Sequence, residues 1–241
     1  MSAENDAREI PFMELYAEHK DLGRMDYGRC LELQSREFES RLAAKSRGEE
    51  CGGCAGRIFT VEHPAVYTLG KHGRAENLLV GEERLKAAGA EFFRTDRGGD
   101  ITFHGEGQLV VYPILDLERL GLGLREYIAV LEQAVMDTVA EYGVATVRSE
   151  GASGVWIEKE GPLRKICAIG VRASRYITMH GLALNVSTDL GRFDCINPCG
   201  FTDRGVASLE GELGYAPAMD EVKGKIINNL EKNLNVKIYK N

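Results

Sequence analysis

The sequence predicts an α+β fold in which a mixed or antiparallel sheet packs against helices. Short apolar segments follow one another between residues 57 and 114, and again between residues 144 and 186. A segment with apolar residues at helical spacing, 124–142, separates these two regions, and another, 219–233, follows them. Strands and helices that occur in separate runs, without regular alternation, are typical of α+β domains.

The first half of the chain is expected to hold one long helix, several strands and a second, short helix. Apolar residues from Tyr27 to Leu42 recur near helical spacing, which predicts a helix over residues 22–45. Glycines then interrupt the pattern, and residues 45–56 are expected to form a loop. The elements predicted next are strands at 57–62 and 65–69, a helix at 81–89, a strand at 91–95, a glycine-rich loop at 97–108 and a strand at 109–114.

The second half contains the clearest helix. Tyr127, Leu131 and Val135 belong to one apolar stripe within 124–142, and Gly143 is a suitable stop. The elements predicted after it are strands at 144–148, 154–158, 166–172 and 175–186, a helix at 219–233 and a strand at 235–239. Because no internal repeat or domain boundary is evident, we expect residues 1–241 to form a single catalytic domain.

Composition narrows the possible classes of function. The chain has 241 residues, 44% hydrophobic and 28% charged residues, and a net charge of −7. This charge argues against broad non-specific binding to nucleic acid or anionic membranes. We expect no membrane span, because no apolar run of the required length of about 18 residues occurs. The polar N-terminus has no signal-peptide core, so the six cysteines are expected to be reduced thiols in the cytoplasm.

The segment 97–108 is dense in glycine and also carries Arg97 and His104. Glycine lets the backbone approach a ligand closely, and both side chains can donate hydrogen bonds. The segment is neither a P-loop nor a dinucleotide fingerprint, because the flanking residues do not fit either motif. A sharp hairpin with a solvated Arg97 and a structural His104 is the alternative.

Lys165 and Cys199 are the candidate catalytic residues. Lys165 begins an apolar strand, and Cys199 lies on a turn between Pro198 and Gly200. A nearby ammonium favours the nucleophilic thiolate, and a neutral lysine can act as a general base. The pair therefore suggests acyl transfer through a cysteine nucleophile, if the fold brings the two residues together. The alternatives are a solvated lysine and a buried, inert thiol, a description that fits Cys167 and Cys195 better than Cys199.

Cys51 and Cys54 have the spacing of half a zinc site or of a redox pair. The sequence offers neither a second C-x-x-C nor a closely spaced histidine pair. We therefore expect an ordinary flexible loop here, and predict no metal and no cofactor.

Several blocks of sequence, taken in order, resemble the octanoyltransferases of lipoate biosynthesis, also called the lipoate-protein ligase B family. Phe103 and Glu106 stand where the family commonly has Tyr and Pro, and the loop around Cys51 and Cys54 looks like an insertion. The family-like core covers about residues 22–210, and a C-terminal helix and strand occupy 217–241. The blocks that carry the resemblance are Leu22-Gly23 with Tyr27 and Gln34, Glu62 to Gly70, Arg97 to Gln108, Tyr112 to Ile114, Lys165 with Ala168 to Gly170, His180 to Asn185, and Pro198 to Gly200.

The resemblance implies a fold like that of the catalytic domains of biotin protein ligases and lipoate ligases. It also implies a reaction, in which octanoyl passes from acyl carrier protein to one lysine of an apo lipoyl domain. The acceptors would be the lipoyl domains of 2-oxoacid dehydrogenases and the glycine cleavage H protein. Cys199 would carry the acyl thioester, and Lys165 would lower the pKa of Cys199 or take a proton. The implied substrate-binding residues are Arg97, Gly98, Gly99, Asp100, Ile101, Thr102, Phe103, His104, Ala168, Ile169, Gly170, Gly181, Leu182 and Ala183.

Two rival functions remain open on sequence alone. One is an ATP-dependent lipoate or biotin ligase, and the other is a non-catalytic protein that binds acyl or lipoyl groups. Acyl length, the acceptor domains, the oxyanion donors and the oligomeric state are also open. Because carrier proteins are usually acidic, we expect a local basic face. Its candidate members are Arg57, Lys71, Arg74, Arg97 and Arg172.

Overall fold

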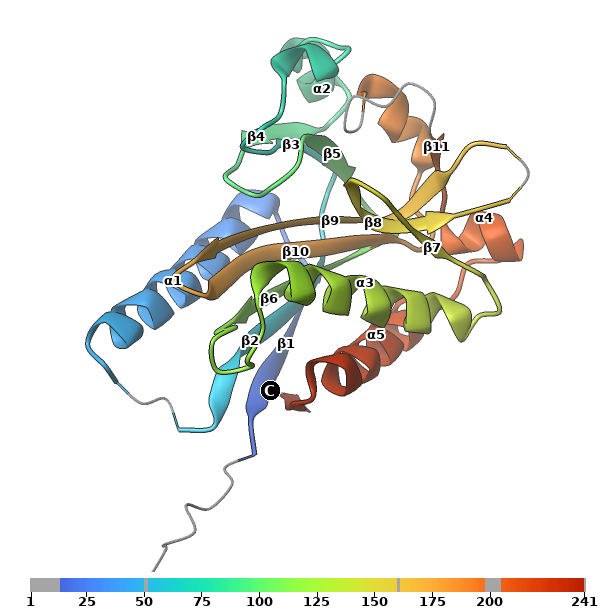
Figure 1. Cartoon of the computed structure of the whole chain (residues 1–241). Coiled ribbons are helices and arrows are strands. Elements are labelled where there is room, and N and C mark those ends of the chain that lie inside the picture. The colour runs from blue at the N-terminus through green and yellow to red at the C-terminus, as the bar shows by residue number, and fades with distance from the viewer. Residues whose placement is uncertain (1–13, 50–51, 160, 198–204, 241) are drawn as a thin grey trace, which may run out of the picture.

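A mixed β-sheet forms the centre of the molecule. The computed structural model describes residues 14–49, 52–159, 161–197 and 205–240. Along the main path of the sheet the strand order is β12-β1-β2-β6-β10-β9-β8-β7, and β11 lies beside β9 (Figure 1). The strands of this sheet are β1 (Tyr16–Arg24), β2 (Cys54–Glu62), β6 (Gln108–Leu115), β7 (Val147–Ser149), β8 (Ala152–Ile157), β9 (Arg164–Ser174), β10 (Ile177–Asn185), β11 (Gly205–Val206) and β12 (Lys237–Lys240).

The sheet is mixed, as the sequence predicts. β1 runs parallel to β2 and β12, and β11 runs parallel to β9. From β2 to β7 the neighbouring strands are antiparallel. The antiparallel part joins three strands that carry the proposed motifs, namely β6, β9 and β10, and so brings these motifs side by side.

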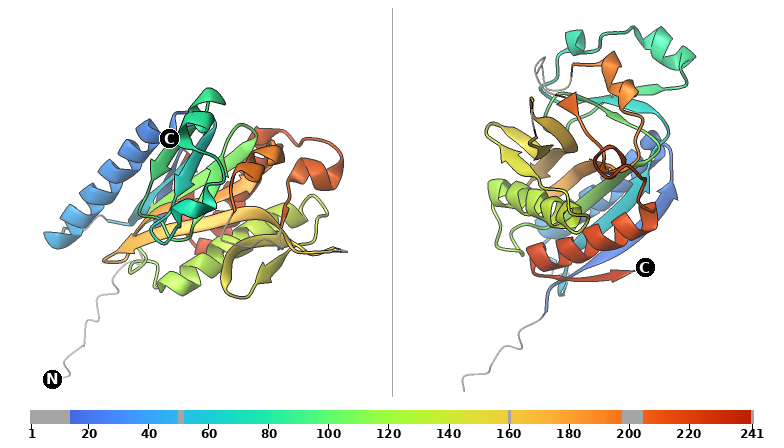
Figure 2. Two further views of the ribbon diagram at one scale, coloured as in Figure 1. Left: turned by 90° about the horizontal axis from the view of Figure 1, so that it is seen from above. Right: turned by 90° about the vertical axis from the view of Figure 1, so that its right-hand side faces the viewer.

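Helices cover both faces of this sheet, as Figure 2 shows. Helix α1 (Tyr27–Ser46) lies on one face, and α3 (Leu124–Ala140) and α5 (Met219–Leu234) lie on the other. The short helix α4 (Leu209–Leu213) follows β11. No helix in the described parts of the chain is both long enough and apolar enough to cross a bilayer.

A smaller sheet stands at one end of the main sheet. Its order is β4 (Glu91–Arg94), β3 (Val66–Leu69) and β5 (Ile101–His104), and α2 (Glu82–Ala87) accompanies it. Two 3₁₀ helices, Ala75–Asn77 and Leu190–Cys195, also occur in the structure. Tyr67 of β3 donates a hydrogen bond to the carbonyl of Arg192, so one of these helices is tied to the small sheet.

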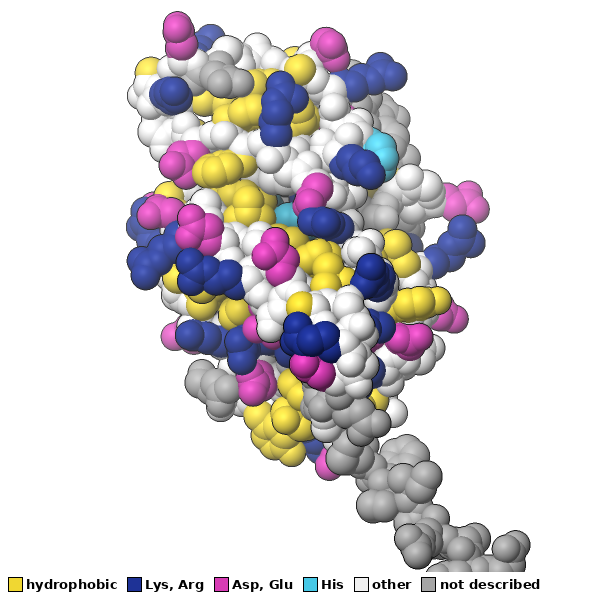
Figure 3. Space-filling view, turned by 90° about the vertical axis from the view of Figure 1, so that its left-hand side faces the viewer, with side chains coloured by type: hydrophobic (Ala, Val, Ile, Leu, Met, Phe, Trp, Pro, Cys, Tyr) yellow, Lys and Arg dark blue, Asp and Glu magenta, His cyan; other side chains and the backbone are white. Residues whose placement is uncertain are grey.

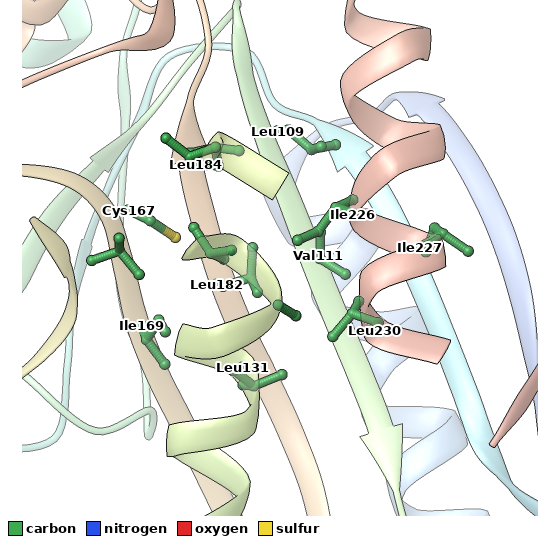
Figure 4. Close-up of a cluster of buried hydrophobic side chains, with 14 of the residues drawn as sticks. Leu109, Val111, Leu131, Cys167, Ile169, Leu182, Leu184, Ile226, Ile227 and Leu230 are labelled. Carbon is green, nitrogen blue, oxygen red and sulfur yellow. The ribbon is translucent and has the colours of Figure 1, made fainter. Parts of the chain in front are cut away.

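The largest core lies between the main sheet and helices α3 and α5 (Figure 4). Leu131 of α3 and Ile226 of α5 are fully buried against Val111 of β6 and Leu182 of β10. A second cluster lies on the other face, where Cys30 and Phe38 of α1 pack with Phe59 of β2. The strands therefore bury both of their faces, which explains the nearly continuous apolar sequences of β6 and β10.

Three of the predicted segments differ from the structure, and α4 and β11 are elements that the sequence does not predict. The helix predicted over 22–45 begins at Tyr27, because residues 16–24 form β1, which the sequence does not reveal. The loop predicted over 45–56 ends at Cys54, where β2 begins. The loop predicted over 97–108 contains β5, because Ile101 to His104 pair with β3.

Candidate functional site

A cavity of about 650 Å³ lies between the glycine-rich segment and the ribbon of β9 and β10. Lys165 and every predicted substrate residue except Phe103 line it. Phe103 is absent from the lining and packs against Tyr67 and Phe193 in a buried cluster. The lining residues that the sequence predicts are Arg97, Gly98, Gly99, Asp100, Ile101, Thr102, His104, Lys165, Ala168, Ile169, Gly170, Gly181, Leu182 and Ala183.

The glycines let the walls of this cavity approach one another. Gly98 N donates to the carbonyl of Val171 at 2.9 Å, so the loop rests directly on β9. A Cβ atom at Gly170 would lie 2.8 Å from the Gly98 carbonyl oxygen, and one at Gly181 would lie 2.1 Å from that of Val111. Larger residues at 170 or 181 would therefore push the walls apart.

Arg97 is buried and holds the small sheet against the loop. Its Nη2 donates to the carbonyl of Thr68 at 2.6 Å and to the Thr68 hydroxyl at 2.9 Å, and its Nη1 donates to the Gly98 carbonyl. The alternative of a solvated Arg97 is thus wrong. The guanidinium sits in the cavity wall, where its charge-assisted hydrogen bonds fix the loop.

His104 belongs to a chain of buried hydrogen bonds. Asn185 donates from Nδ2 to the Ala207 carbonyl, so its Oδ1 accepts from Gln108 Nε2 at 2.8 Å. Gln108 Oε1 therefore faces His104 Nδ1, at 2.8 Å, and this nitrogen carries the proton. His104 Nε2 is left to accept from Thr68, whose hydroxyl lies 3.5 Å away. Burial lowers the pKa of His104 to about 3, so the ring is neutral.

Tyr27, Tyr112 and His180 also line the cavity, although the sequence does not single them out as site residues. Tyr112 donates to His63 Nε2 at 2.9 Å, and His63 Nδ1 donates to the Met25 carbonyl. Burial lowers the pKa of His63 to about 4 and raises that of Tyr112. This end of the cavity is therefore built from neutral, oriented groups.

His180 has an unusual backbone conformation in the middle of β10. Its φ is +63°, and its Nε2 lies 2.9 Å from Asp96 Oδ1. Its Nδ1 is buried and has no hydrogen-bond partner among the described residues. His180 begins one of the sequence blocks that carry the family resemblance, but it is not among the predicted substrate-binding residues.

Lys165 is partly buried in β9 and lies between two neighbouring strands. Its ammonium nitrogen is 4.5 Å from the centre of the Trp156 ring of β8. On its other side Val206 of β11 is its backbone partner, and Ala207 N donates to the Lys165 carbonyl. The backbone of Lys165 is therefore held from both directions.

Cys199 lies outside the described residues, and so do Pro198 and Gly200. The described chain on either side is anchored. Asn197 N donates to the Asn77 carbonyl at 2.8 Å, and Gly205 and Val206 pair with Arg164 and Lys165. The distance between Lys165 and Cys199 stays a prediction.

The other cysteines differ in their surroundings. Cys30 and Cys167 are buried, and burial raises the pKa of each thiol to about 12, which makes them unreactive. Cys195, which was expected in the core, is only partly buried. Cys54 is partly buried in β2, and Cys51 lies outside the described residues. Within the described residues no group of three or more His, Cys, Asp or Glu side chains is placed to hold a metal ion.

The predicted basic face is smaller than expected. Arg57 pairs with Glu18 and Glu37, Arg172 pairs with Asp96, and Arg97 is buried. Lysine and arginine alternate with acidic side chains on the face drawn in Figure 3. Of the predicted members, only Lys71 and Arg74 are exposed and form no ion pair with another described residue.

The chain is similar to known proteins over most of its length. It is 54% identical over 201 residues to an octanoyltransferase of Bacteroides fragilis, covering 83% of this chain and 90% of the relative. It is 51% identical over 216 residues to an octanoyltransferase of Flavobacterium johnsoniae, covering 88% and 93% respectively.

Solved structures share the fold. A bipartite lipoate protein ligase of Thermoplasma acidophilum superimposes with a TM-score of 0.70 at 17% identity, covering 94% of this chain and 87% of the ligase. A biotin protein ligase of Aquifex aeolicus gives a TM-score of 0.51 at 15% identity, covering 92% and 69%. The predicted fold class is therefore confirmed. The family model of the lipoyl protein ligase A/B catalytic domain matches residues 31–231, and the chain belongs to this family.

Proposed function

We propose that this chain is an octanoyltransferase that moves an octanoyl group from acyl carrier protein to a lysine of apo lipoyl domains. The observation that carries the proposal is the cavity, which gathers Lys165 and the glycine-rich signature around one space. Curated relatives named octanoyltransferase, with about half of their residues identical, support octanoyl transfer.

The cavity suits a short fatty chain. Val110, Ile169 and Ala183 contribute apolar surface to the wall that Lys165 shares. Each methylene buried there would stabilise the bound acyl group by about 0.8 kcal/mol. Arg97 and the backbone of the glycine-rich segment supply polar groups to the same cavity, where a thioester carbonyl would need them.

The proposed reaction has two steps. The Cys199 thiolate attacks the thioester carbonyl, and the carrier thiol leaves with a proton from the Lys165 ammonium. The acceptor amine then attacks the acyl-enzyme and gives its proton to the neutral Lys165, while the Cys199 thiolate leaves. Since the donor is already a thioester, no ATP is needed, and the two carrier proteins can use one site in turn.

The partners and the compartment belong to the same proposal. The donor would be octanoyl-acyl carrier protein. The acceptors would be lipoyl domains of 2-oxoacid dehydrogenases and the glycine cleavage H protein. The four free cysteines of the described residues, two of them buried, fit the reducing cytoplasm.

Intact-mass spectrometry tests the proposal. After mixing with octanoyl-acyl carrier protein, the enzyme should gain one octanoyl group that hydroxylamine removes. Cys199→Ser should abolish this labile adduct, whereas Cys195→Ser should retain it. An ATP-dependent ligase would keep most activity without Cys199 and would consume ATP. A binding protein would bind the carrier and never form the adduct.

A further inference from the structure

Trp156 is an aromatic neighbour of Lys165. The two residues are direct cross-strand partners of β8 and β9, and the Lys165 ammonium lies 4.5 Å from the centre of the indole ring. This distance is within the range of about 6 Å for cation–π attraction, which is strongest for tryptophan. Trp156 is 1% exposed, and its Nε1 donates to the carbonyl of Ala152 at 3.4 Å, so the ring itself is held in place.

Gly154 lies beside the lysine stem. Its φ is +126°, which suits glycine, and a Cβ atom at this position would lie 3.5 Å from Cε and 3.6 Å from Cδ of Lys165. The same atom would lie 2.5 Å from the carbonyl oxygen of Cys167. The stem of Lys165 therefore passes over a position where only hydrogen fits.

A buried carboxylate fixes this part of β8. Glu132 of α3 accepts from Gly154 N at 3.0 Å through one oxygen and from Arg148 Nε at 3.1 Å through the other. The register of β8 against β9 shifts between Val155 and Trp156, immediately after Gly154. The irregularity lies beside the Trp156–Lys165 pair, and the hydrogen bond from Gly154 to Glu132 ties this part of β8 to α3.

We propose that Trp156 is a positioning residue for the acyl transfer, whose indole face seats the Lys165 ammonium at the cavity wall. The seat consists of the Trp156 ring and Gly154, and Glu132 supports it from α3. The inference rests on the proposed function of Lys165. It adds that the amine is delivered to the reacting sulfur in one orientation.

Nuclear magnetic resonance of the wild-type protein tests the seat directly. With ¹³C-labelled lysine, the ε-methylene protons of Lys165, assigned by their loss in Lys165→Arg, should resonate upfield of those of the other lysines because of the indole ring current. A Lys165 signal at the ordinary lysine position would overturn the proposal. This measurement does not depend on activity.

Two matched substitutions test the consequence for the reaction. Trp156→Phe and Trp156→Met leave side chains of similar volume, but only phenylalanine keeps an aromatic face. We expect octanoyl-enzyme formation to be about 2- to 30-fold slower in the methionine variant, in kcat with KM unchanged, and the phenylalanine variant to recover part of this loss. Thermal unfolding should show equal stability of the two variants.

The outcomes separate the two proposals. Equal rates in the phenylalanine and methionine variants would overturn the role of Trp156, while the wild-type adduct would still support acyl transfer. If the wild-type enzyme forms no hydroxylamine-labile adduct, then the proposed function itself is wrong. In that case an upfield Lys165 signal would still show that the lysine lies over the Trp156 ring.

Discussion

The two faces of the main sheet are packed in different ways. The face under α3 and α5 is filled by aliphatic side chains such as Leu131, Leu182 and Ile226. The space between the other face and the small sheet holds buried polar groups, including Arg97, His63 and His104, each joined to named partners by hydrogen bonds. Unpaired buried polar groups are costly, and the hydrogen bonds of Arg97, His63 and His104 offset this cost. The difference indicates that the aliphatic face provides stability, while the polar side is shaped for a ligand.

Removal of Lys165 should have the largest effect and should separate activity from stability. We expect Lys165→Met to slow acyl transfer about 100- to 10,000-fold, because both the thiolate partner and the proton acceptor are lost. Since Lys165 is only partly buried, the melting temperature of the variant should differ little from that of the wild type. Single-turnover kinetics measure the first value, and calorimetry measures the second.

Lys165→Arg sharpens this test. Arginine keeps the positive charge but does not release its proton. The variant should form the octanoyl-enzyme faster than Lys165→Met and should still fail to pass the group to an amine. Equal behaviour of the two variants would show that the charge of Lys165 has no part in the first step.

A substitution in the aliphatic face should give the opposite pattern. Leu131→Ala removes a fully buried side chain between α3 and the sheet, and should lower the free energy of unfolding by about 2–5 kcal/mol. The folded fraction should retain the wild-type kcat, because Leu131 does not line the cavity. Urea denaturation and active-site titration check both values. A large fall in kcat at unchanged stability would contradict the division of roles between the two faces.

Acidification should lower the stability of the protein through the buried histidines of the polar side. Burial holds the pKa of His63 at about 4 and that of His104 at about 3, below the value of about 6.5 in an unfolded chain. Below pH ~6.5 the two histidines therefore bind protons in the unfolded state but not in the folded state. The free energy of unfolding falls as the pH is lowered from about 6.5 to about 4. Each histidine contributes a slope of up to about 1.4 kcal/mol per pH unit, and above pH ~7 this dependence vanishes.

The histidine contribution can be isolated by substitution. Denaturation midpoints between pH 7.5 and 4.5 should show a smaller slope in His63→Gln than in the wild type. His72 is exposed, so His72→Gln should keep the wild-type slope. If His63→Gln leaves the slope unchanged, then His63 is not a source of the acid sensitivity.

The smallest effect is expected from the exposed cations beside the cavity. Lys71→Glu and Arg74→Glu should raise the KM for octanoyl-acyl carrier protein about 2- to 10-fold at low salt, and the effect should fade near ~0.5 M salt. Lys232→Glu, on the exposed surface of α5, serves as the control. If all three variants show the same KM, carrier docking at Lys71 and Arg74 is excluded.

Sequence patterns predict the aliphatic face better than the polar side. The stripes of α3 and α5 and the apolar strands β6 and β10 follow from periodicity, because their burial depends on local spacing. β1 was missed, since Tyr16–Arg24 is largely polar and is held by ladders with β2 and β12, which are distant in the sequence. The single domain predicted over residues 1–241 stays a prediction.

The site was predicted through motifs, and its geometry depends on register. The motifs placed Gly170 and Gly181 in separate segments, and only the β9–β10 ladder makes them direct partners. Phe103 lies inside the signature, yet it packs with Tyr67 and Phe193 in a buried cluster and does not line the cavity. Trp156 gives no signal in the sequence, because its contact with Lys165 arises from the pairing of β8 with β9.

The chain of hydrogen bonds from Arg97 to Ala207 has a practical consequence for protein engineering. Gln108 and Asn185 each use both ends of their amide groups, so neither can flip without breaking contacts with its neighbours. Grafting the glycine-rich signature alone onto a related ligase scaffold would carry Gln108 along, but it would separate Arg97 from Thr68 and Gln108 from Asn185. A working chimera would need to transplant Thr68 and Asn185 in the same exchange.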